Sequence, residues 1–346
     1  MPALGAEWPS YIELHRTGEL AARVEEARER MRNCRLCARE CGVDRLAGEL
    51  GACRTGTLAR VHGSGPHYGE EAVLVGQGGS GTIFFVGCSM DCVFCQNHEI
   101  SHPLEDRGLK VASIGEVPGA DNWRYAEIES GAGLWKTTPK WAEPLEWIVR
   151  VMLGLQATGC ENINLVSPSH VVPQILQAVD MAVSRGLNLP LVYNTGCYDS
   201  LSTLQLLDGV VDIYMPDMKF ADNKVAERLC GVHRYATTCR TAIREMHRQV
   251  GDLVLDERGV AMRGLLVRHL VLPEGVAGTS EVAQFLAREV STDTYLSLMD
   301  QYKPAHKAEA RADIGRRLTM AEYAVAMRQA KAAGLSRVVG QEEPIG

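Results

Sequence analysis

From residue 81 onward the chain alternates short apolar runs with segments of helical periodicity. Such alternation is typical of parallel strands joined by right-handed helical crossovers. The predicted strands occupy residues 82–86, 162–166, 190–194, 211–215, 265–271 and 295–299. The predicted helices occupy residues 144–157, 172–185, 200–208, 223–230, 237–249 and 280–289. Six strands with five crossovers predict an α/β fold, a partial (β/α)6 barrel whose strand carboxyl ends carry the site.

The chain of 346 residues divides into four regions. We predict an N-terminal helix, a cysteine-rich lobe, the barrel and a C-terminal helical extension at residues 1–33, 34–80, 81–300 and 301–346, respectively. Apolar residues at three- and four-residue steps predict one amphipathic helix over residues 11–33. An insertion at residues 104–141 interrupts the barrel and is rich in glycine, tryptophan and charge. It is either a surface loop or a lid that contacts the substrate.

Composition narrows the class of protein. The formal net charge is -7 and the pI is about 5.8, which provides no basic surface for nucleic acid. The chain contains no apolar run long enough to span a membrane, and Met1 to Leu20 lack the apolar core of a signal peptide. We therefore expect a cytoplasmic protein that binds neither nucleic acid nor membrane. Eleven cysteines in such a protein indicate metal or redox chemistry rather than disulfides.

Three cysteines follow directly from the first predicted strand. Cys88, Cys92 and Cys95 are separated by three and then two residues. Three thiolates at this spacing can hold a [4Fe-4S] cluster. Because this run supplies no fourth thiolate, one iron keeps an open position. The alternative is a zinc knuckle that is completed by a histidine such as His98 or His102.

The spacing Cys88-x3-Cys92-x2-Cys95 resembles the signature of the radical S-adenosylmethionine (SAM) superfamily. Several phrases are similar to the subfamily related to pyruvate formate-lyase activating enzyme, in its X-type branch, at residues 81–88, 95–101, 162–170, 192–195 and 298–302. The resemblance implies a TIM-like partial barrel of the radical SAM type. It also implies an enzyme that reductively cleaves SAM at the open iron to a 5′-deoxyadenosyl radical, which abstracts hydrogen from a substrate.

The resemblance further suggests which residues meet SAM. Superfamily members usually have a Gly-Gly-Glu-like run after the second strand, where this chain instead reads Ser167-Pro168-Ser169-His170. Ser167 and Ser169 are therefore candidate partners of the SAM amino group by position. His170 is a candidate for contacting the SAM carboxylate or the substrate, and the alternative is a hydrogen-bonded structural histidine.

Two further groups of residues stand at predicted strand ends, and the resemblance assigns a role to each. Asn194-Thr195 and the run from Met215 through Asp217 to Lys219 match places where activating enzymes bind a monovalent cation near SAM, with the lysine toward the substrate. Asn194 replaces the usual carboxylate, so a plain hydrogen-bond network is the alternative.

Arg268, at the end of the fifth predicted strand, is placed against SAM by the resemblance, where its guanidinium would hold the carboxylate or the ribose. The alternative is an ion pair with a strand-end acid.

A second cysteine group lies in the predicted lobe, at Cys34, Cys37, Cys41 and Cys53. Four soft ligands suit a structural zinc ion or a complete auxiliary cluster equally well, and free thiols are the third alternative. The other four cysteines are expected to be small core residues, at positions 160, 197, 230 and 239.

Three hypotheses of function remain open. The enzyme would act on a small molecule or a peptide, or it would install a glycyl radical on a partner enzyme. In either case a flavodoxin or ferredoxin would supply the electron. A hypothesis of a different class is a non-catalytic iron–sulfur or zinc protein that binds or relays electrons.

Overall fold

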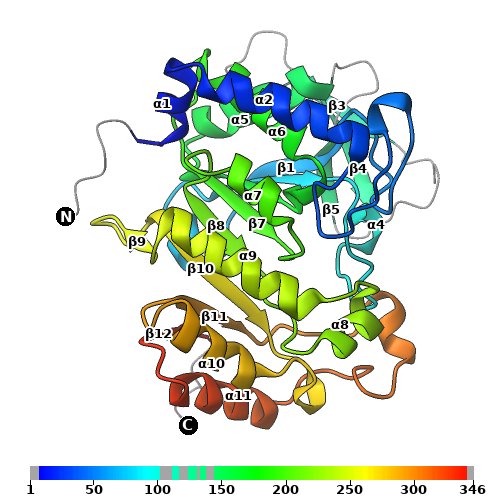
Figure 1. Cartoon of the computed structure of the whole chain (residues 1–346), viewed down its shortest axis with the longest axis vertical. Coiled ribbons are helices and arrows are strands. Elements are labelled where there is room, and N and C mark those ends of the chain that lie inside the picture. The colour runs from blue at the N-terminus through cyan, green and yellow to red at the C-terminus, as the bar shows by residue number, and fades with distance from the viewer. Residues whose placement is uncertain (1–7, 102–110, 117–123, 131–132, 138–143, 341–346) are drawn as a thin grey trace.

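The structure, a computed structural model, describes residues 8–101, 111–116, 124–130, 133–137 and 144–340. Its main sheet has nine strands in the order β1-β2-β6-β7-β8-β10-β11-β12, and β9 pairs with β10. The strands are β1 (Val61–His67), β2 (Ser80–Phe85), β6 (Asn162–Val166), β7 (Leu191–Thr195), β8 (Ile213–Pro216), β9 (Val254–Leu255), β10 (Ala261–Leu270), β11 (Tyr295–Met299) and β12 (Arg337–Val339). The sheet runs from β1 in the upper half of the molecule to β12 in the lower half (Figure 1).

The helices of the described residues connect these strands or cover the ends of the sheet (Figure 1). They are α1 (Tyr11–Arg16), α2 (Glu19–Glu29), α3 (Ala72–Val75), α4 (His98–Ser101), α5 (Pro144–Ala157), α6 (Val172–Val183), α7 (Leu201–Leu206), α8 (Asn223–Cys230), α9 (Tyr235–Val250), α10 (Thr279–Glu289) and α11 (Met320–Ala332). The helix predicted at 11–33 as one element is two, because the chain turns at Gly18 with a left-handed φ of 78°. A short 3-10 turn over Arg30–Asn33 follows α2.

The predicted α/β fold is confirmed. Each of the six predicted strands has a counterpart, and all neighbouring pairs from β2 to β12 in the main order are parallel. Spatial order follows chain order because each helical crossover returns the chain to the next position in the sheet. The sheet is open, since β1 and β12 end it.

Two of the predicted regions contain strands of the main sheet. The lobe predicted at 34–80 contains β1, which pairs antiparallel with β2 and so belongs to the main sheet. The helical extension predicted at 301–346 contains α11 but also β12, which pairs in parallel with β11. Both strands are short or rich in glycine and histidine, so they lack the apolar run that marked the others.

Part of the insertion at 104–141 has regular secondary structure. Its described residues form a three-stranded antiparallel sheet from β3 (Val111–Glu116), β4 (Arg124–Ser130) and β5 (Gly133–Thr137). This small sheet lies beside the main one, where β5 contacts β1. The other residues of the insertion lie outside the described part of the chain, and the role of a lid stays a prediction.

The two faces of the main sheet differ in polarity because alternate side chains of a strand point to opposite faces. One face is apolar and packs against the helices in the main core, through residues such as Ile83, Leu165, Tyr193, Leu265 and Leu296. Each fully buried side chain of this kind contributes about 1.5–3 kcal/mol. The opposite face carries polar residues at Ser80, Thr82, Asn162, Asn164, Asn194 and Arg268.

The segment around α3 covers this polar face. Leu74 packs against Val192, Ile213 and Met215 in a smaller apolar cluster. The Leu74 carbonyl accepts a hydrogen bond of 2.8 Å from Nδ2 of Asn162. The segment therefore closes the amino-terminal part of the face and leaves charged groups near the carboxyl ends of the strands. Among the described residues, no helix has the length and apolar character needed to cross a membrane.

Candidate active site

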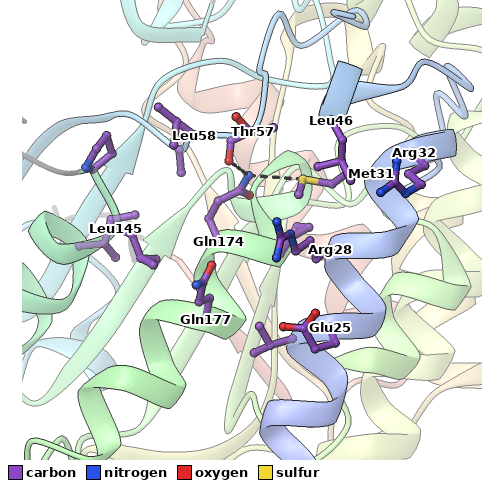
Figure 2. Close-up of a pocket in the computed structure, with 15 residues that line it drawn as sticks. Glu25, Arg28, Met31, Arg32, Leu46, Thr57, Leu58, Leu145, Gln174 and Gln177 are labelled. Carbon is purple, nitrogen blue, oxygen red and sulfur yellow. Dashed lines mark hydrogen bonds between the residues drawn. The ribbon is translucent and has the colours of Figure 1, made fainter. Parts of the chain in front are cut away.

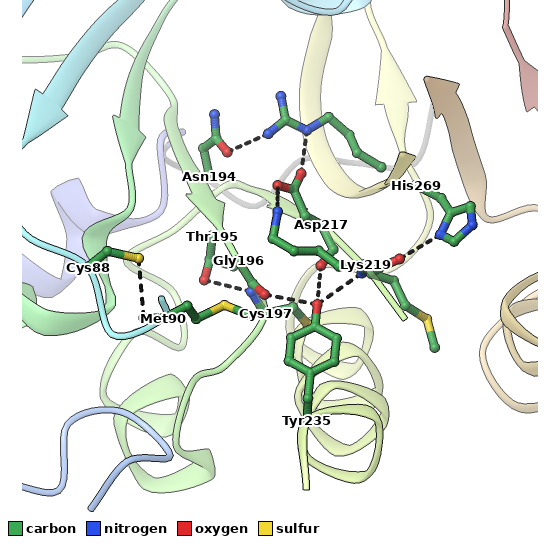
Figure 3. A network of polar contacts seen from close by, with 12 residues as sticks. Cys88, Met90, Asn194, Thr195, Gly196, Cys197, Asp217, Lys219, Tyr235 and His269 are labelled. Carbon is green, nitrogen blue, oxygen red and sulfur yellow. Dashed lines mark hydrogen bonds and ion pairs between the residues drawn. The ribbon is translucent and has the colours of Figure 1, made fainter. Parts of the chain in front are cut away.

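Charged side chains meet at the carboxyl ends of β7, β8 and β10 (Figure 3). Asp217 follows β8, and its Oδ2 accepts a hydrogen bond from Nζ of Lys219 at 2.6 Å. Its Oδ1 accepts one from Nε of Arg268 at 2.8 Å. The Nη2 of Arg268 donates to Oδ1 of Asn194, also at 2.8 Å. The structure thus joins four of the predicted site residues in one network.

Glu70 belongs to the same network, although no pattern in the sequence indicates it. It lies between β1 and α3, and its Oε1 accepts a hydrogen bond of 2.9 Å from Nη1 of Arg268. Its Oε2 accepts one of 3.0 Å from Nδ2 of Asn164. Glu70 and Arg268 are 198 positions apart, so only the tertiary fold brings them together. Arg268 thus contacts two carboxylates, Asp217 and Glu70, and Asp217 also contacts Lys219.

Burial and charge act in opposite directions on these groups. The side chains of Arg268, Asp217 and Lys219 are only 15%, 17% and 19% exposed. Burial alone would raise the pKa of Asp217, but Arg268 and Lys219 hold that pKa below its usual value. Burial would lower the pKa of Lys219, but the Asp217 carboxylate raises it. Lys219 is therefore a permanent cation at neutral pH rather than a proton donor.

A second network surrounds Thr195 at the end of β7. Its Oγ1 donates to Oδ2 of Asp199 at 2.6 Å and lies 3.2 Å from Oγ of Ser169. The hydroxyl of Tyr193 donates to Oδ1 of Asp199 at 2.8 Å. Asp199 is buried, and this burial raises its pKa. Asp199 is not among the site residues that the sequence predicts. Thr195 and Ser169 are thus brought together, in contact with a buried acid that has no sequence signature.

The side chains of two other predicted residues are not part of these networks. Ser167 adopts a left-handed φ of 56° before the short 3-10 turn Pro168–His170, and its N–H donates to the Asn194 carbonyl at 2.9 Å. Met215 is fully buried in the apolar cluster with Leu74. Its side chain therefore helps to hold the α3 segment on the sheet.

His170 contacts the start of the cysteine loop. It is 2% exposed, and its Nε2 donates to the Val86 carbonyl at 2.9 Å. Its own carbonyl accepts a hydrogen bond of 2.8 Å from Nη1 of Arg45, which is also buried. Burial lowers the pKa of His170 to about 4, so the ring is neutral at pH 7. These contacts are those of a hydrogen-bonded structural histidine.

The cysteine triplet occupies the loop between β2 and α4. Two apolar side chains of this loop, Met90 and Phe94, are 2% and 6% exposed. The Phe94 ring meets Phe220 and Tyr302 edge-on, at centroid distances of 6.0 and 6.3 Å. The aromatic contacts exclude water from one side of the loop.

Gly196 allows this loop to approach the strand ends (Figure 3). A Cβ at this position would lie 2.9 Å from Sδ of Met90 and 3.7 Å from Cε of Lys219. Burial raises the pKa of Cys88 to about 12, whereas Lys219 acts to lower it. Lys219 acts in the same direction on the thiols of Cys92 and Cys95. The ammonium group therefore lies within electrostatic range of the whole triplet.

The cysteine loop offers three soft sulfur donors. In the part of the chain that the structure describes, no three His, Cys, Asp or Glu side chains form an arrangement that would hold a single metal ion. A cubane cluster is larger than one ion, so its thiolates stand further apart than the ligands of an ion. The three half-buried thiols lie on one loop and affect the pKa of one another. Soft sulfur donors of this kind fit a [4Fe-4S] cluster.

The zinc-knuckle alternative requires a histidine such as His98 or His102 beside the three thiols. The His98 ring stacks on the His306 ring, at a centroid distance of 4.7 Å and an interplanar angle of 19°. His102 lies outside the described residues.

The four cysteines of the lobe gather in one small region. Burial raises the pKa of Cys37 to about 12, and Cys53, Cys41 and Cys34 raise it as well. A Cβ at Gly51 would lie 2.9 Å from Sγ of Cys41, so this turn tolerates no side chain without a shift. As they stand in the described structure, these four thiols are not arranged to hold a single metal ion, and the choice between zinc, a cluster and free thiols stays open.

A cavity of about 600 Å³ lies between α2, α5, α6 and the lobe (Figure 2). Its wall includes Arg28 of α2, Ile148 of α5 and Gln174 of α6. Gln174 spans to the lobe, where its Nε2 donates to the Thr57 carbonyl at 2.7 Å. None of the predicted site residues lines this cavity, so it is separate from the charged network.

Comparison with known proteins adds one relationship. No protein-family model matches the chain. The chain is 30% identical over 315 residues to "Uncharacterized protein MJ0674" of Methanocaldococcus jannaschii, a match that covers 90% of this chain and 78% of the relative. The chain belongs to the same family as this archaeal protein. Because the match covers 90% of this chain, it spans the cysteine loop and the strand ends from β7 to β10.

Proposed function

We propose that the protein is a radical SAM enzyme, in which Cys88, Cys92 and Cys95 hold a [4Fe-4S] cluster with one open iron position. The observation that carries this proposal is the place of the triplet. Its loop leaves the carboxyl end of β2 and packs beside Gly196, next to the charged network at the ends of β7, β8 and β10. The carboxyl edge of a parallel α/β sheet is where such folds carry their sites.

When bound, the cluster would supply one electron to SAM and so release a 5′-deoxyadenosyl radical. The residues of the chain would prepare the space around it. Met90 and Phe94 keep water from the loop, as the chemistry of a carbon radical requires. Lys219, held at 2.6 Å by Asp217, provides a positive charge that offsets the thiolates.

The contacts of Arg268 bear on how SAM would bind. Its guanidinium already donates to Asp217, Glu70 and Asn194. This is the ion pair with strand-end acids that stood as the alternative to a direct SAM contact. We propose that Arg268 acts as a positioning residue that orients Asp217 and hence Lys219. Because Asn194 and Asp217 are joined through Arg268, the hydrogen-bond network is also favoured over a monovalent-cation site.

The remaining elements of the proposal follow from the resemblance of the sequence to the radical SAM superfamily. A partial barrel of the radical SAM type is compatible with the sequential order of the parallel strands. The SAM amino group would meet the backbone near Ser167 and Ser169, after β6. The substrate would be a small molecule or a peptide, and a flavodoxin or ferredoxin would deliver the electron. The insertion sheet beside β1 would then border the approach to the site.

The decisive experiment is anaerobic cluster reconstitution followed by reduction with dithionite in the presence of SAM. We expect formation of 5′-deoxyadenosine and a [4Fe-4S]⁺ signal in electron paramagnetic resonance that changes when SAM is added. Cys92→Ala should abolish the product. Cys160→Ala is the matched control, because Cys160 is buried at the other end of the sheet, before β6. Absence of 5′-deoxyadenosine from the cluster-loaded wild-type protein would favour the non-catalytic iron–sulfur protein.

The same assay separates the two enzyme versions. Adding a candidate glycyl radical enzyme would produce a glycyl radical signal only if the chain is an activating enzyme. A small-molecule or peptide enzyme would instead show faster 5′-deoxyadenosine formation with its substrate.

A further inference from the structure

The cavity between α2, α5, α6 and the lobe has the size and the lining of a small-molecule site (Figure 2). Its volume of about 600 Å³ falls within the range of roughly 300–1,000 Å³ that is usual for such sites. Apolar side chains from three segments form much of its wall, namely Met31, Leu58, Leu145 and Ile148. Leu58 is 55% exposed, so an apolar molecule in the cavity would remove some of its surface from water.

Arg28 gives this wall a cation that differs from the other arginines of α2 and of the turn that follows it. Those arginines form ion pairs with glutamates three or four positions earlier, as Arg23–Glu19, Arg30–Glu26 and Arg32–Glu29. Arg28 extends from α2 toward α6, and its side chain has no ion pair or hydrogen bond to another described residue (Figure 2). Its guanidinium can therefore bind a carboxylate through two parallel hydrogen bonds.

Gln174 adds a hydrogen-bond acceptor from α6. It is 6% exposed, and its Nε2 donates to the Thr57 carbonyl at 2.7 Å. That bond fixes the orientation of the amide, because turning the amide over would bring two oxygen acceptors together. Oε1 of Gln174 is left as a buried acceptor with no hydrogen-bond partner among the described residues. Buried polar atoms normally have a partner, so a donor from a bound molecule would complete this one.

We propose that the cavity binds a small aromatic carboxylate that carries one N–H donor, the class to which indole-3-acetate belongs. The carboxylate pairs with Arg28, the ring lies against Met31 and Ile148, and the N–H donates to Oε1 of Gln174. Because Oε1 is shielded from solvent, this last contact requires the amide of Gln174 to tilt about its bond to Thr57.

The remaining charges of the lining limit the ligand to one negative charge. Glu25 lies one turn before Arg28 on α2, and Arg32, one turn after Arg28, already pairs with Glu29. A second anionic group on the ligand would be repelled by the Glu25 carboxylate. None of these residues belongs to the charged network at the strand ends or to the cysteine triplet, so the site does not depend on the proposed radical SAM chemistry.

Isothermal titration calorimetry of the full chain with indole-3-acetate tests the site, and we expect one molecule to bind per chain. Indole-3-acetamide lacks the negative charge, and 1-benzothiophene-3-acetate has a sulfur atom in place of the N–H, so each analogue removes one polar contact and keeps the shape. Binding should weaken roughly tenfold or more without the charge and roughly threefold or more without the donor. The proposal is overturned if indole-3-acetate does not bind, or if the three compounds bind equally well.

Variants locate the site and provide matched controls. In Arg28→Gln the preference for indole-3-acetate over indole-3-acetamide should disappear, whereas it should persist in Arg30→Gln, because Arg30 pairs with Glu26 and does not line the cavity. Leu58→Glu places a carboxylate beside the bound anion and should weaken binding. Leu50→Glu should not, because Leu50 is 57% exposed but does not line the cavity. If a control variant has the same effect as its counterpart, indole-3-acetate binds elsewhere and the proposal fails.

Gln174→Met separates a contact with the ligand from a purely structural role of this residue. Methionine keeps the length of the side chain but offers no strong acceptor to an N–H. Loss of the Thr57 contact alone would weaken the binding of indole-3-acetate and 1-benzothiophene-3-acetate equally. We instead expect the two compounds to have the same affinity for this variant, and a preserved preference for indole-3-acetate would refute the contact with Gln174. Far-ultraviolet circular dichroism of each variant verifies folding.

Discussion

Asp217→Asn tests whether the charged network is buried and balanced as the structure indicates. The carboxylate lies between two cations, at 2.6 Å from Lys219 and 2.8 Å from Arg268, and the three side chains are 15–19% exposed. The substitution removes the carboxylate that contacts both cations and leaves the ammonium group of Lys219 without its partner. Breaking a buried ion pair typically costs about 3–5 kcal/mol. Because some solvent reaches these groups, we expect the lower end, about 3 kcal/mol.

The free energy of unfolding can be measured by urea titration followed by circular dichroism. A loss of about 3 kcal/mol reduces the folding equilibrium constant by roughly 100-fold. Glu146→Gln is the matched control, because Glu146 also lies between two arginines, Arg150 and Arg185, but on the surface. Exposed pairs of that kind contribute about 1 kcal/mol or less. Asp217→Asn must therefore lose clearly more stability than Glu146→Gln.

A double variant sharpens the test. Adding Lys219→Met to Asp217→Asn removes the cation that was left without a partner, so part of the lost stability should return, by about 1–2 kcal/mol. The reasoning is refuted if Asp217→Asn alone costs no more than the surface control. It is also refuted if the double variant is less stable than Asp217→Asn, because the ammonium would then not be the source of the cost.

Three further perturbations follow from the structure. Burial raises the pKa of Asp212 from 3.8 to about 7, so the contribution of this residue to stability is full below about pH 4 and is lost as pH rises through about 7. Asp212→Asn cannot titrate, so between about pH 4 and pH 8 the wild-type chain should lose up to about 4 kcal/mol more stability than the variant in urea titrations; equal pH profiles would contradict this. Cys37→Ala should lower the zinc or iron content of the purified chain measured by atomic emission, whereas unchanged metal would indicate free thiols in the lobe. Gly196→Ala should press on Met90 and slow 5′-deoxyadenosine formation by roughly tenfold at a nearly unchanged unfolding midpoint, and an unaffected rate would contradict the close approach of the cysteine loop.

Most strands could be predicted because they are short apolar runs bounded by helical periodicity. β6 and β11 match the predicted ranges, and β2, β7, β8 and β10 differ by a few residues at their ends. β1 could not be recognised, since it contains glycine, histidine and proline and pairs at the edge of the sheet. β1 forms because it pairs with β2, and a local sequence pattern does not reveal such a pairing.

The site was predictable only where position along a strand determines position in space. Asn194, Asp217 and Arg268 stand at strand ends, so a parallel sheet brings them to one edge. Glu70 reaches the same region from the turn between β1 and α3. Its contact with Arg268 joins residues 198 positions apart, and no spacing in the sequence signals it. The polar residues at the strand ends could thus be predicted from the sequence, but Glu70, which also binds Arg268, could not.

The position of Lys219 depends on a helix that is remote from the cysteine loop in sequence. The hydroxyl of Tyr235, in the first turn of α9, accepts the N–H of Lys219 at 2.9 Å and lies 2.7 Å from the carbonyl of Asp217. It also lies 3.0 Å from the carbonyl of Gly196. One phenol therefore ties the segment after β7 to the segment after β8. Because Gly196 touches Met90, the spacing between the cysteine loop and the Lys219 ammonium is determined by α9 as much as by the sheet.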